Sequence, residues 1–382
     1  MPRSADTLAA HASRDNNSFG VVRLAAAIMV IVTHAYGVVG GWNAEEPLAQ
    51  STGFSLGSHA VNVFFILSGF MVAASWERSA NWLDFAAARL LRIMPALICV
   101  NLLIVLAGGL FLTTASPAQY WSVENIGLFL YKATVALSAT ASLAGVFETA
   151  PIPGAIDTPI WTIRFEIVCY MTLMAFLGLM SRLRLQRTGR LIAISAILAA
   201  SAWVMSLDES PHVFRFAGHM ARFVFAFYLG VLAWTLRDLL RIRFAVAAAL
   251  VALAAAAYGL PWLVRLPLTL VATAYLAFWV GSRRMGWLQR ETARTDLSYG
   301  AYICGFFIQQ WLIVALPGSS VLLNATLATA IALVVAFISW TLIEKPALSL
   351  RKSPIVAKLS RMLAGERGWT LRPAETGARP ME

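Results

Sequence analysis

The chain of 382 residues is 59% hydrophobic and only 13% charged, and its mean hydropathy is +0.71. Because a soluble domain carries about 25% charged residues, this composition excludes a pair of ordinary soluble domains and favours one polytopic membrane unit. The net charge of +11 does not indicate nucleic-acid binding, since the arginines cluster in short segments between long apolar runs.

Apolar runs long enough to cross a bilayer as helices follow one another along the chain. The sequence predicts an all-α fold, a polytopic membrane helix bundle with about ten transmembrane helices. A further apolar stretch, 126–147, contains Lys132 and a centre rich in Ser, Thr and Ala, so we expect a re-entrant or surface-lying element there. The expected spans are 19–40, 58–76, 92–113, 160–180, 191–207, 219–236, 244–260, 266–281, 297–316 and 320–343.

The distribution of basic residues predicts the orientation of these helices. With the N-terminus inside, Lys132, Arg215 and Arg265 fall in segments assigned to the outer face, whereas most other Lys and Arg residues fall on the inner face. This bias follows the positive-inside rule. Counting 126–147 as a span would instead place the arginines of 182–190 outside.

The two ends of the chain are expected to lie outside the membrane, on its cytoplasmic side. Residues 1–18 are polar and lack a cleavable signal pattern. Residues 19–346 form the expected transmembrane domain, and 347–382 is expected to be a disordered tail, because it has Gly, Pro and scattered charges without apolar periodicity.

The cysteines do not indicate a metal site or a disulfide. Cys99, Cys169 and Cys304 all lie within apolar segments and lack the spacing of metal ligands, so we expect packing roles. The chain also lacks the motifs of serine hydrolases, P-loop NTPases, zinc proteases and dinucleotide-binding folds.

Arg23 and His34 share one membrane-length segment. Eleven residues of helix make three turns plus roughly 20°, which places both side chains on one face, roughly 16 Å apart along the axis. A charged residue within a bilayer normally faces protein or water, and histidine is suited to moving protons near neutral pH. The pair indicates a buried polar path; a snorkelling arginine and a structurally hydrogen-bonded histidine are the alternative.

Two further polar groups lie at later spans. Arg89 and Arg92 are three residues apart before Pro95, so they share a helix face and form a clamp for phosphate or serve only as positive-inside anchors. Glu166 lies one to two turns into its span with Tyr170 one turn further. An intramembrane carboxylate is a functional candidate, whereas pairing with Arg164 is the structural alternative.

The segment 61–70 contains Asn62 and the dipeptide Ser68-Gly69. Small residues allow a neighbouring helix to approach closely, so this segment by itself indicates helix packing. Asn62 and the nearby His59 add polar groups close to the outer end of the same span.

Together these segments resemble the acyltransferase-3 family of integral membrane transferases. Each block alone is weak, but their order and spacing over 19–346 are specific. The matching blocks are Arg23/His34, segment 61–70, Arg89/Arg92/Pro95, Trp161/Thr162/Glu166/Tyr170, Ser298/Tyr299/Tyr302 and segment 344–346.

The resemblance implies transfer of an acyl group, usually acetyl, from cytoplasmic acyl-CoA to a hydroxyl of an envelope or exported saccharide or its lipid-linked precursor. It also implies a multi-pass protein of the bacterial inner membrane, without a metal, in contact with membrane lipids and polysaccharide-biosynthesis proteins. Carried over by position, the catalytic residues are His34 and Glu166, the acyl-CoA-binding residues are Arg23, Arg89 and Arg92, and the substrate-binding residues are Asn62, Tyr170 and Tyr302.

The chain departs from the family pattern at two positions. Asn62 stands where many members have Asp, which removes a charged partner for a histidine. Gly305 stands where many members have His, which leaves the identity of the acceptor open. The absence of a large appended outer domain resembles the short, stand-alone members that decorate exopolysaccharides or nodulation factors.

Two other functions use the same kinds of residue. A transporter of an acyl or polar solute would also need intramembrane Arg, His and Glu, but no pair of Gly/Pro-broken spans occurs at matching positions in two halves of the chain. A non-catalytic scaffold of a polysaccharide-export complex conflicts with the intact pair of Arg23 and His34.

Overall fold

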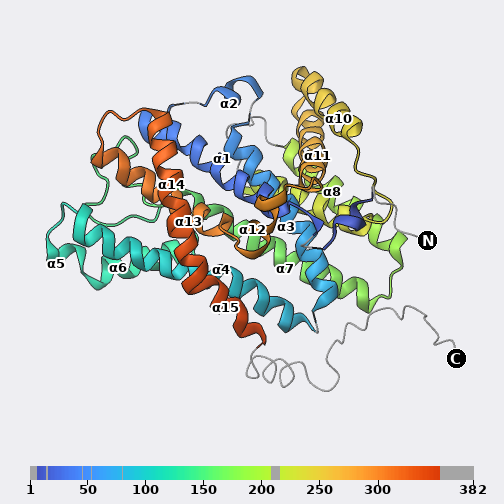
Figure 1. Ribbon diagram of the computed structural model, residues 1–382, viewed down its shortest axis with the longest axis horizontal. Helices are drawn as coiled ribbons and strands as arrows, with labels where there is room; N and C mark the ends of the chain where they lie inside the picture. The colour runs from blue at the N-terminus through green and yellow to red at the C-terminus, as the bar shows by residue number, and fades with distance from the viewer. Residues whose placement is uncertain are drawn as a thin grey trace.

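The computed structural model describes residues 7–13, 16–44, 46–52, 54–79, 81–207 and 216–352. Within these ranges the chain is helical, without strands, which confirms the predicted all-α class. In Figure 1, α1, α3 and α13 lie in the middle of the bundle, with α5 and α6 at one end and α10 and α11 at the other. Buried apolar side chains form a continuous core that connects α1, α3, α7, α9 and α13.

The helices differ widely in length. The long ones are α1 (Phe19–Gly40), α3 (Leu56–Arg78), α4 (Trp82–Ala107), α7 (Trp161–Arg182), α8 (Arg187–Ser206), α9 (Phe216–Thr235), α10 (Phe244–Ala256), α11 (Trp262–Gly281), α13 (Ser298–Ala315) and α14 (Val321–Ser339). The short ones are α2 (Pro47–Thr52), α5 (Pro117–Tyr120), α6 (Val123–Leu130), α12 (Gly286–Arg294) and α15 (Lys345–Ser349).

Every predicted span corresponds to one of the long helices. Among the described residues, eight helices are long and apolar enough to cross a membrane, and a ninth is added if α12 and α13, which meet at 85°, form one broken span. The apolar segment Phe244–Gly259 is shorter than a full span. The chain is therefore a multi-pass membrane protein with a polytopic helix bundle.

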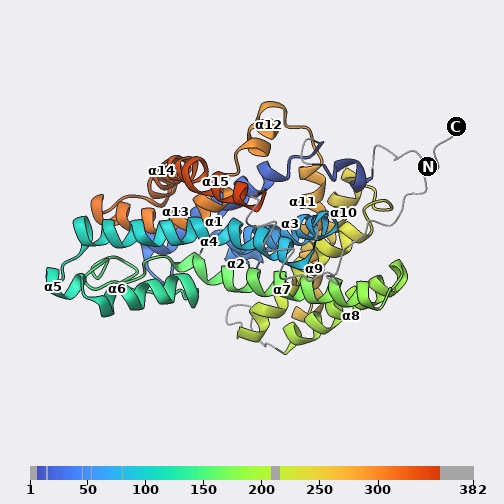
Figure 2. The same cartoon turned by 90° about the horizontal axis from the view of Figure 1, so that it is seen from below.

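The stretch 126–147 does not form a spanning helix, in agreement with the prediction. It contains most of α6, a π turn at Tyr131–Val135 and then irregular chain. Asn101 of α4 donates a hydrogen bond to Thr134 at 3.0 Å, and Figure 2 shows α5 and α6 beside the end of α4. This stretch thus packs along the end of a span rather than crossing beside it.

The third span begins ten residues earlier than the expected start at residue 92. Asn81 caps α4 by accepting a hydrogen bond from the backbone of Asp84 at 2.9 Å, and the helix continues through Pro95. Arg89 and Arg92 therefore lie inside the helix and not at its entrance. The sequence suggested a later start because two charges and a proline normally mark a helix boundary.

Helices α3 and α9 approach each other most closely at two glycines. A Cβ atom on Gly69 would lie 1.9 Å from the carbonyl oxygen of Phe227, and one on Gly230 would lie 2.0 Å from that of Ile66. Backbone atoms cannot move aside as a flexible side chain can. These glycines therefore set the distance between two central helices.

Replacing Gly69 with alanine is expected to destabilise the protein by about 3 kcal/mol or more, because the added methyl group overpacks a backbone contact. Thermal unfolding of the detergent-solubilised protein measures the effect. Gly127 of α6 is the matched control, since a Cβ there meets nothing within 4 Å. Equal melting temperatures for Gly69→Ala and Gly127→Ala would contradict this close packing.

The described parts of both tails are tied to the bundle. Leu8 and Ala9 donate backbone hydrogen bonds, each of 2.9 Å, to Leu240 and Arg237. The chain remains helical to Lys352, beyond the expected domain end at 346. The rest of the expected C-terminal tail, 353–382, lies outside the described residues. The three cysteines are free thiols, as expected for packing residues.

Candidate active site

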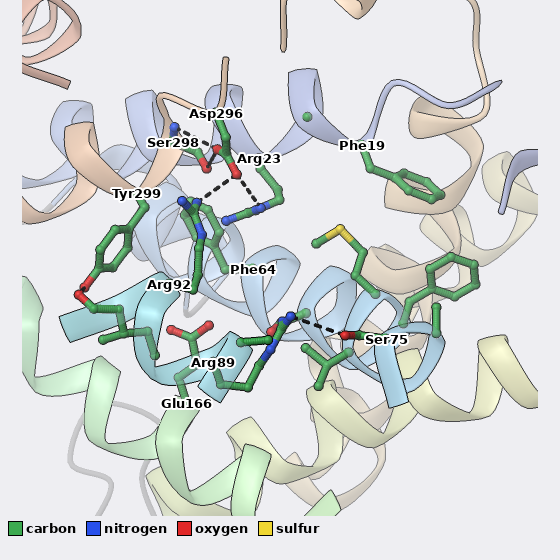
Figure 3. Close-up of a pocket in the computed structure, with 18 of the residues that line it drawn as sticks. Phe19, Arg23, Phe64, Ser75, Arg89, Arg92, Glu166, Asp296, Ser298 and Tyr299 are labelled. Carbon is green, nitrogen blue, oxygen red and sulfur yellow. Dashed lines mark hydrogen bonds and ion pairs between the residues drawn. The ribbon is translucent and has the colours of Figure 1, made fainter. Parts of the chain in front are cut away.

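A cavity of about 470 Å³ lies between α1, α3, α4, α7, α12 and α13 (Figure 3). Its walls bring together side chains from segments that are far apart in the sequence. The predicted site residues that line it are Arg23, Arg89, Arg92, Glu166, Tyr170 and Tyr302.

One wall of the cavity is a buried ionic network. Asp296 pairs with Arg23 at 2.9 Å and with Arg92 at 2.8 Å, and Arg92 also pairs with Glu344 at 2.6 Å. Glu344 is only 1% exposed. The guanidiniums of Arg23 and Arg92 are therefore neutralised by the protein itself.

Local backbone features place the two carboxylates of this network. Asp296 lies in the break between α12 and α13, where it accepts hydrogen bonds from the backbone and hydroxyl of Ser298 at 3.2 and 2.6 Å. A carboxylate at a helix N-terminus also interacts favourably with the helix dipole. Glu344 ends a π turn, Trp340–Glu344, and accepts a hydrogen bond from Ser339 at 3.2 Å.

Arg89 has different surroundings from Arg92. Its Nη2 donates to the hydroxyl of Ser75 at 3.3 Å, its guanidinium lies 5.8 Å from the ring centre of Tyr170, and its buried Nε has no partner among the described residues. Arg78 also lines the cavity and, within the described ranges, forms no ion pair. Arg89 and Arg78 are thus cations of the cavity wall that form no ion pair with a described carboxylate, and we call them uncompensated in this sense.

A third arginine at the same end of the cavity is paired. Arg351 forms two hydrogen bonds of 2.8 Å with the carboxylate of Asp84. This hydrogen bonding raises the pKa of Arg351 above its ordinary value. The cavity mouth therefore combines Arg351, which is paired with a carboxylate, with Arg78 and Arg89, which are not.

The middle of the cavity holds a short chain of hydroxyl and carboxyl groups. The hydroxyl of Tyr170 donates to Glu166 and lies 3.0 Å from the hydroxyl of Ser68. Figure 3 shows Glu166 projecting toward the space beside Arg89 and Arg92. Arg164 does not pair with Glu166; its guanidinium lies over the ring of Phe165 at 4.9 Å. Glu166 consequently belongs to the cavity.

Tyr302 closes the end of the cavity that lies away from Arg78 and Arg89. Its hydroxyl lies 2.6 Å from that of Thr162 and donates to the carbonyl oxygen of Pro159 at 3.0 Å. The ring of Phe64 packs edge-on against the Tyr302 ring, with the two centres 5.6 Å apart. We call this contact of Phe64, Thr162 and Tyr302 the partition.

His34 lies beyond the partition and does not line the cavity. Its ring packs edge-on against Phe306, one helical turn after Tyr302, with centres 5.3 Å apart. No hydrogen bond to the ring occurs within the described residues. The predicted catalytic histidine is thus separated from the cavity by a single turn of α13.

Asn62 also lies outside the cavity lining. It is fully buried and accepts a hydrogen bond of 2.9 Å from Nε of Arg222 on α9. Nη2 of the same arginine donates to the carbonyl oxygen of Ser58 at 3.1 Å. The position where many family members carry Asp therefore faces a buried arginine on α9.

Sequence reasoning missed Asp296 and assigned no role to Glu344 and Arg78. Glu344 was visible in the terminal Glu-Lys-Pro block, and Asp296 precedes the Ser298-Tyr299 block by two residues. Arg78 carries no sequence signal beyond its place among the inner-face charges. In the described part of the chain, no group of three or more His, Cys, Asp or Glu residues is arranged to hold a metal ion.

Comparisons with known proteins identify the family of the chain. The model of the "Acyltransferase domain" family matches residues 16–344. "Nodulation protein 10" of Rhizobium leguminosarum bv. viciae is 29% identical, covering 92% of this chain and 98% of that protein. "O-acetyl transferase" of Shigella phage Sf6 is 28% identical, covering 89% of this chain and 98% of that protein. No solved structure matches significantly.

The family match covers residues 16–344 and so includes all four residues of the ionic network, Arg23, Arg92, Asp296 and Glu344. It also decides between an enzyme and the transporter or scaffold alternatives. The chain belongs to the acyltransferase-3 family, and it is an O-acyltransferase of the multi-pass membrane type.

Proposed function

We propose that this enzyme transfers an acyl group, most simply acetyl, from cytoplasmic acyl-CoA to a hydroxyl group of an envelope or exported saccharide. The observation that carries the proposal is the path of the cavity, which leads from Arg78 and Arg89 to the partition, and Tyr302 of the partition lies one turn of α13 before Phe306, which His34 contacts. The name of one relative, an O-acetyl transferase, favours acetyl, and a saccharide acceptor is what the resemblance to the family implies.

The mouth of the cavity suits the phosphate groups of acyl-CoA. Guanidiniums bind phosphate through charge-assisted hydrogen bonds, and Arg78 and Arg89 are the cavity arginines that lack an internal carboxylate. The buried Nε of Arg89, which has no partner among the described residues, is a donor ready for such a ligand. Arg23 and Arg92 contribute by holding Asp296 and the wall in place.

The length of the cavity suits a narrow thioester arm. On α3, which lines the cavity from end to end, Ser75 and Phe64 are eleven residues apart, or roughly 16 Å along the helix. An arm held at the arginines would place its thioester beside Glu166 and Tyr170 and then at the partition. Tyr302 and Tyr170 are the side chains that contact the donor there.

The acceptor approaches from the opposite side, where His34 lies. His34 either takes the proton of the acceptor hydroxyl as general base or carries the acyl group itself, and both routes need an imidazole. In this proposal the protein lies in the bacterial inner membrane with both termini cytoplasmic.

Asn62 acts indirectly, by fixing Arg222 near the acceptor side.

Reconstitution tests the proposed reaction directly. Purified protein in lipid vesicles is supplied with labelled acetyl-CoA on one side and candidate glycans on the other, with His34→Ala as the control. Transfer of label to the glycan that depends on His34 supports the proposal. Movement of label or glycan across the membrane without bond formation would contradict it.

Replacing Arg89 with alanine is expected to raise the KM for acyl-CoA about tenfold or more, because a charge-assisted phosphate contact is worth about 1.5–3 kcal/mol. High salt should reduce the difference between the variant and the parent, since it screens the same contact. Arg89→Lys should recover part of the affinity. Initial rates against acyl-CoA concentration provide the measurement.

The control for this prediction is Arg284→Ala, which removes an exposed arginine outside the cavity. Its KM for acyl-CoA should match that of the parent enzyme. If Arg89→Ala also retained the parental KM, Arg89 would be a topology anchor and not a donor-binding residue.

A further inference from the structure

Asp157 is a buried carboxylic acid without a partner. It is 2% exposed, and neither carboxylate oxygen forms a hydrogen bond with any described residue. Other buried acids of the bundle are satisfied: Asp296 and Glu344 by arginines, and Glu46 by the backbone N–H of Leu56 at 2.6 Å. Because burying an unpaired carboxyl costs several kcal/mol, its presence indicates a partner that forms during function.

The chain around Asp157 is fixed against α13. Gln310 donates to the carbonyl oxygens of Ile152 and Ala155 at 2.8 and 3.0 Å. Two turns earlier on the same helix, Tyr302 donates to the carbonyl oxygen of Pro159 at 3.0 Å. Asp157 lies midway between Ala155 and Pro159, so it is held beside the two-turn stretch of α13 from Tyr302 to Gln310.

His34 packs against the same stretch of α13. Its ring contacts Phe306, which lies midway between Tyr302 and Gln310. One turn further along α1, Val38 packs in a single apolar cluster with Ile152, Ala155 and Phe306. An imidazole and a carboxyl, each without a hydrogen-bond partner in the described chain, therefore both lie beside the stretch of α13 from Tyr302 to Gln310.

We propose that Asp157 is the positioning residue for His34. Its carboxylate accepts the N–H of the imidazole in the loaded enzyme and balances the positive charge that the ring gains. The assignment rests on the proposed acyl transfer. No hydrogen bond joins the two groups in this structure, and catalytic hydrogen bonds commonly reach their working geometry only when substrate binds.

The proposed step is balanced in atoms and charge. The acceptor hydroxyl gives its proton to one ring nitrogen of His34 while its oxygen bonds to the thioester carbonyl carbon. The carbon–sulfur bond then breaks, and the leaving thiolate takes the proton from the imidazolium. Asp157 accepts a hydrogen bond from the second ring N–H throughout. Before the transfer, the other ring nitrogen therefore presents its lone pair to the acceptor hydroxyl.

The surroundings of Asp157 agree with this role. Burial raises the pKa of the Asp157 carboxyl well above its usual range, so the group needs a nearby cation to remain ionised. An imidazolium supplies that cation. Glu166 is a poorer partner for His34, because Tyr170 already holds it within the donor cavity.

The test compares Asp157→Asn, Asp157→Glu and the unsubstituted full-length protein in vesicles, with labelled acetyl-CoA and a glycan that accepts label. Asp157→Asn should lower kcat about 100-fold and leave the KM for acetyl-CoA unchanged, because the donor mouth lies elsewhere. Its Tm should stay equal or rise, since an unpaired buried acid is removed. Asp157→Glu should recover part of kcat. Glu46→Gln, which loses a satisfied carboxylate, should lower Tm and calibrates that measurement.

Distinct results separate this inference from the proposed function. Parental kcat in Asp157→Asn, alongside an inactive His34→Gln, would overturn the pairing and leave acyl transfer intact. A parallel fall of kcat and Tm, without recovery in Asp157→Glu, would assign Asp157 a structural role and also overturn it. If the unsubstituted protein showed no His34-dependent transfer, the proposed function would itself fail.

Discussion

Replacing His34 with glutamine is expected to abolish acyl transfer, with a loss of about 1,000-fold or more, while the protein remains folded and inserted. Glutamine keeps a polar group of similar size but cannot take a proton or carry an acyl group. Among the described residues the His34 ring makes one aromatic contact, with Phe306, so little packing is lost. Label transfer in vesicles measures activity, and thermal unfolding measures folding.

His219→Gln is the matched control for this experiment. His219 is another half-buried histidine of a spanning helix, packed against Trp161, but it lies on α9 and does not line the cavity. It should retain transfer. Substantial turnover by His34→Gln at normal expression would exclude both proton transfer and acyl carriage by this residue.

Replacing Arg92 with alanine is expected to destabilise the protein by about 3–5 kcal/mol. The guanidinium links Asp296 to Glu344, and its removal leaves Glu344 buried without its ionic partner. The effect should appear as a large fall in the thermal unfolding midpoint and in the yield of folded protein. Arg92→Ala is thus expected to lower stability more than it lowers affinity for acyl-CoA.

Two variants separate an effect of Arg92 on stability from an effect on acyl-CoA affinity. Arg92→Met combined with Glu344→Gln should be more stable than Arg92→Ala, because the pair is removed without leaving a buried charge. Arg89→Ala should unfold near the parental midpoint. A normally folded Arg92→Ala that only raised the KM for acyl-CoA would show that Arg92 binds donor phosphate, as its sequence position suggested.

The helices and much of the cavity wall could be predicted from the sequence because both depend on local periodicity. Apolar runs of membrane length marked the spans, and residues three or four apart in them had to share a face. Glu166 and Tyr170 were linked in this way, and the structure joins them by a hydrogen bond. The family resemblance then predicted which of these faces meet, and six predicted residues line one cavity.

The electrostatic state of the arginines could not be predicted in the same way. Arg92 is neutralised by residues 204 and 252 positions away in the chain, and no local pattern reports such contacts. Arg89, one helical turn earlier, escapes this pairing. The partition was hidden for the same reason, because Thr162 and Tyr302 lie 140 residues apart. Asp157 in turn resembled an ordinary turn residue beside Thr and Pro.

The partition also bears on the electrical sealing of the membrane. An enzyme that meets one substrate from each side risks becoming a leak, and each proton that crosses releases about 2.3 kcal/mol per 100 mV of membrane potential. The hydrogen-bonded hydroxyls of Thr162 and Tyr302, capped by the Phe64 ring, end the cavity before it reaches His34. In the proposed orientation, the three side chains of the partition keep water from forming a continuous column, so acylation of an external glycan consumes the acyl donor without dissipating the proton gradient.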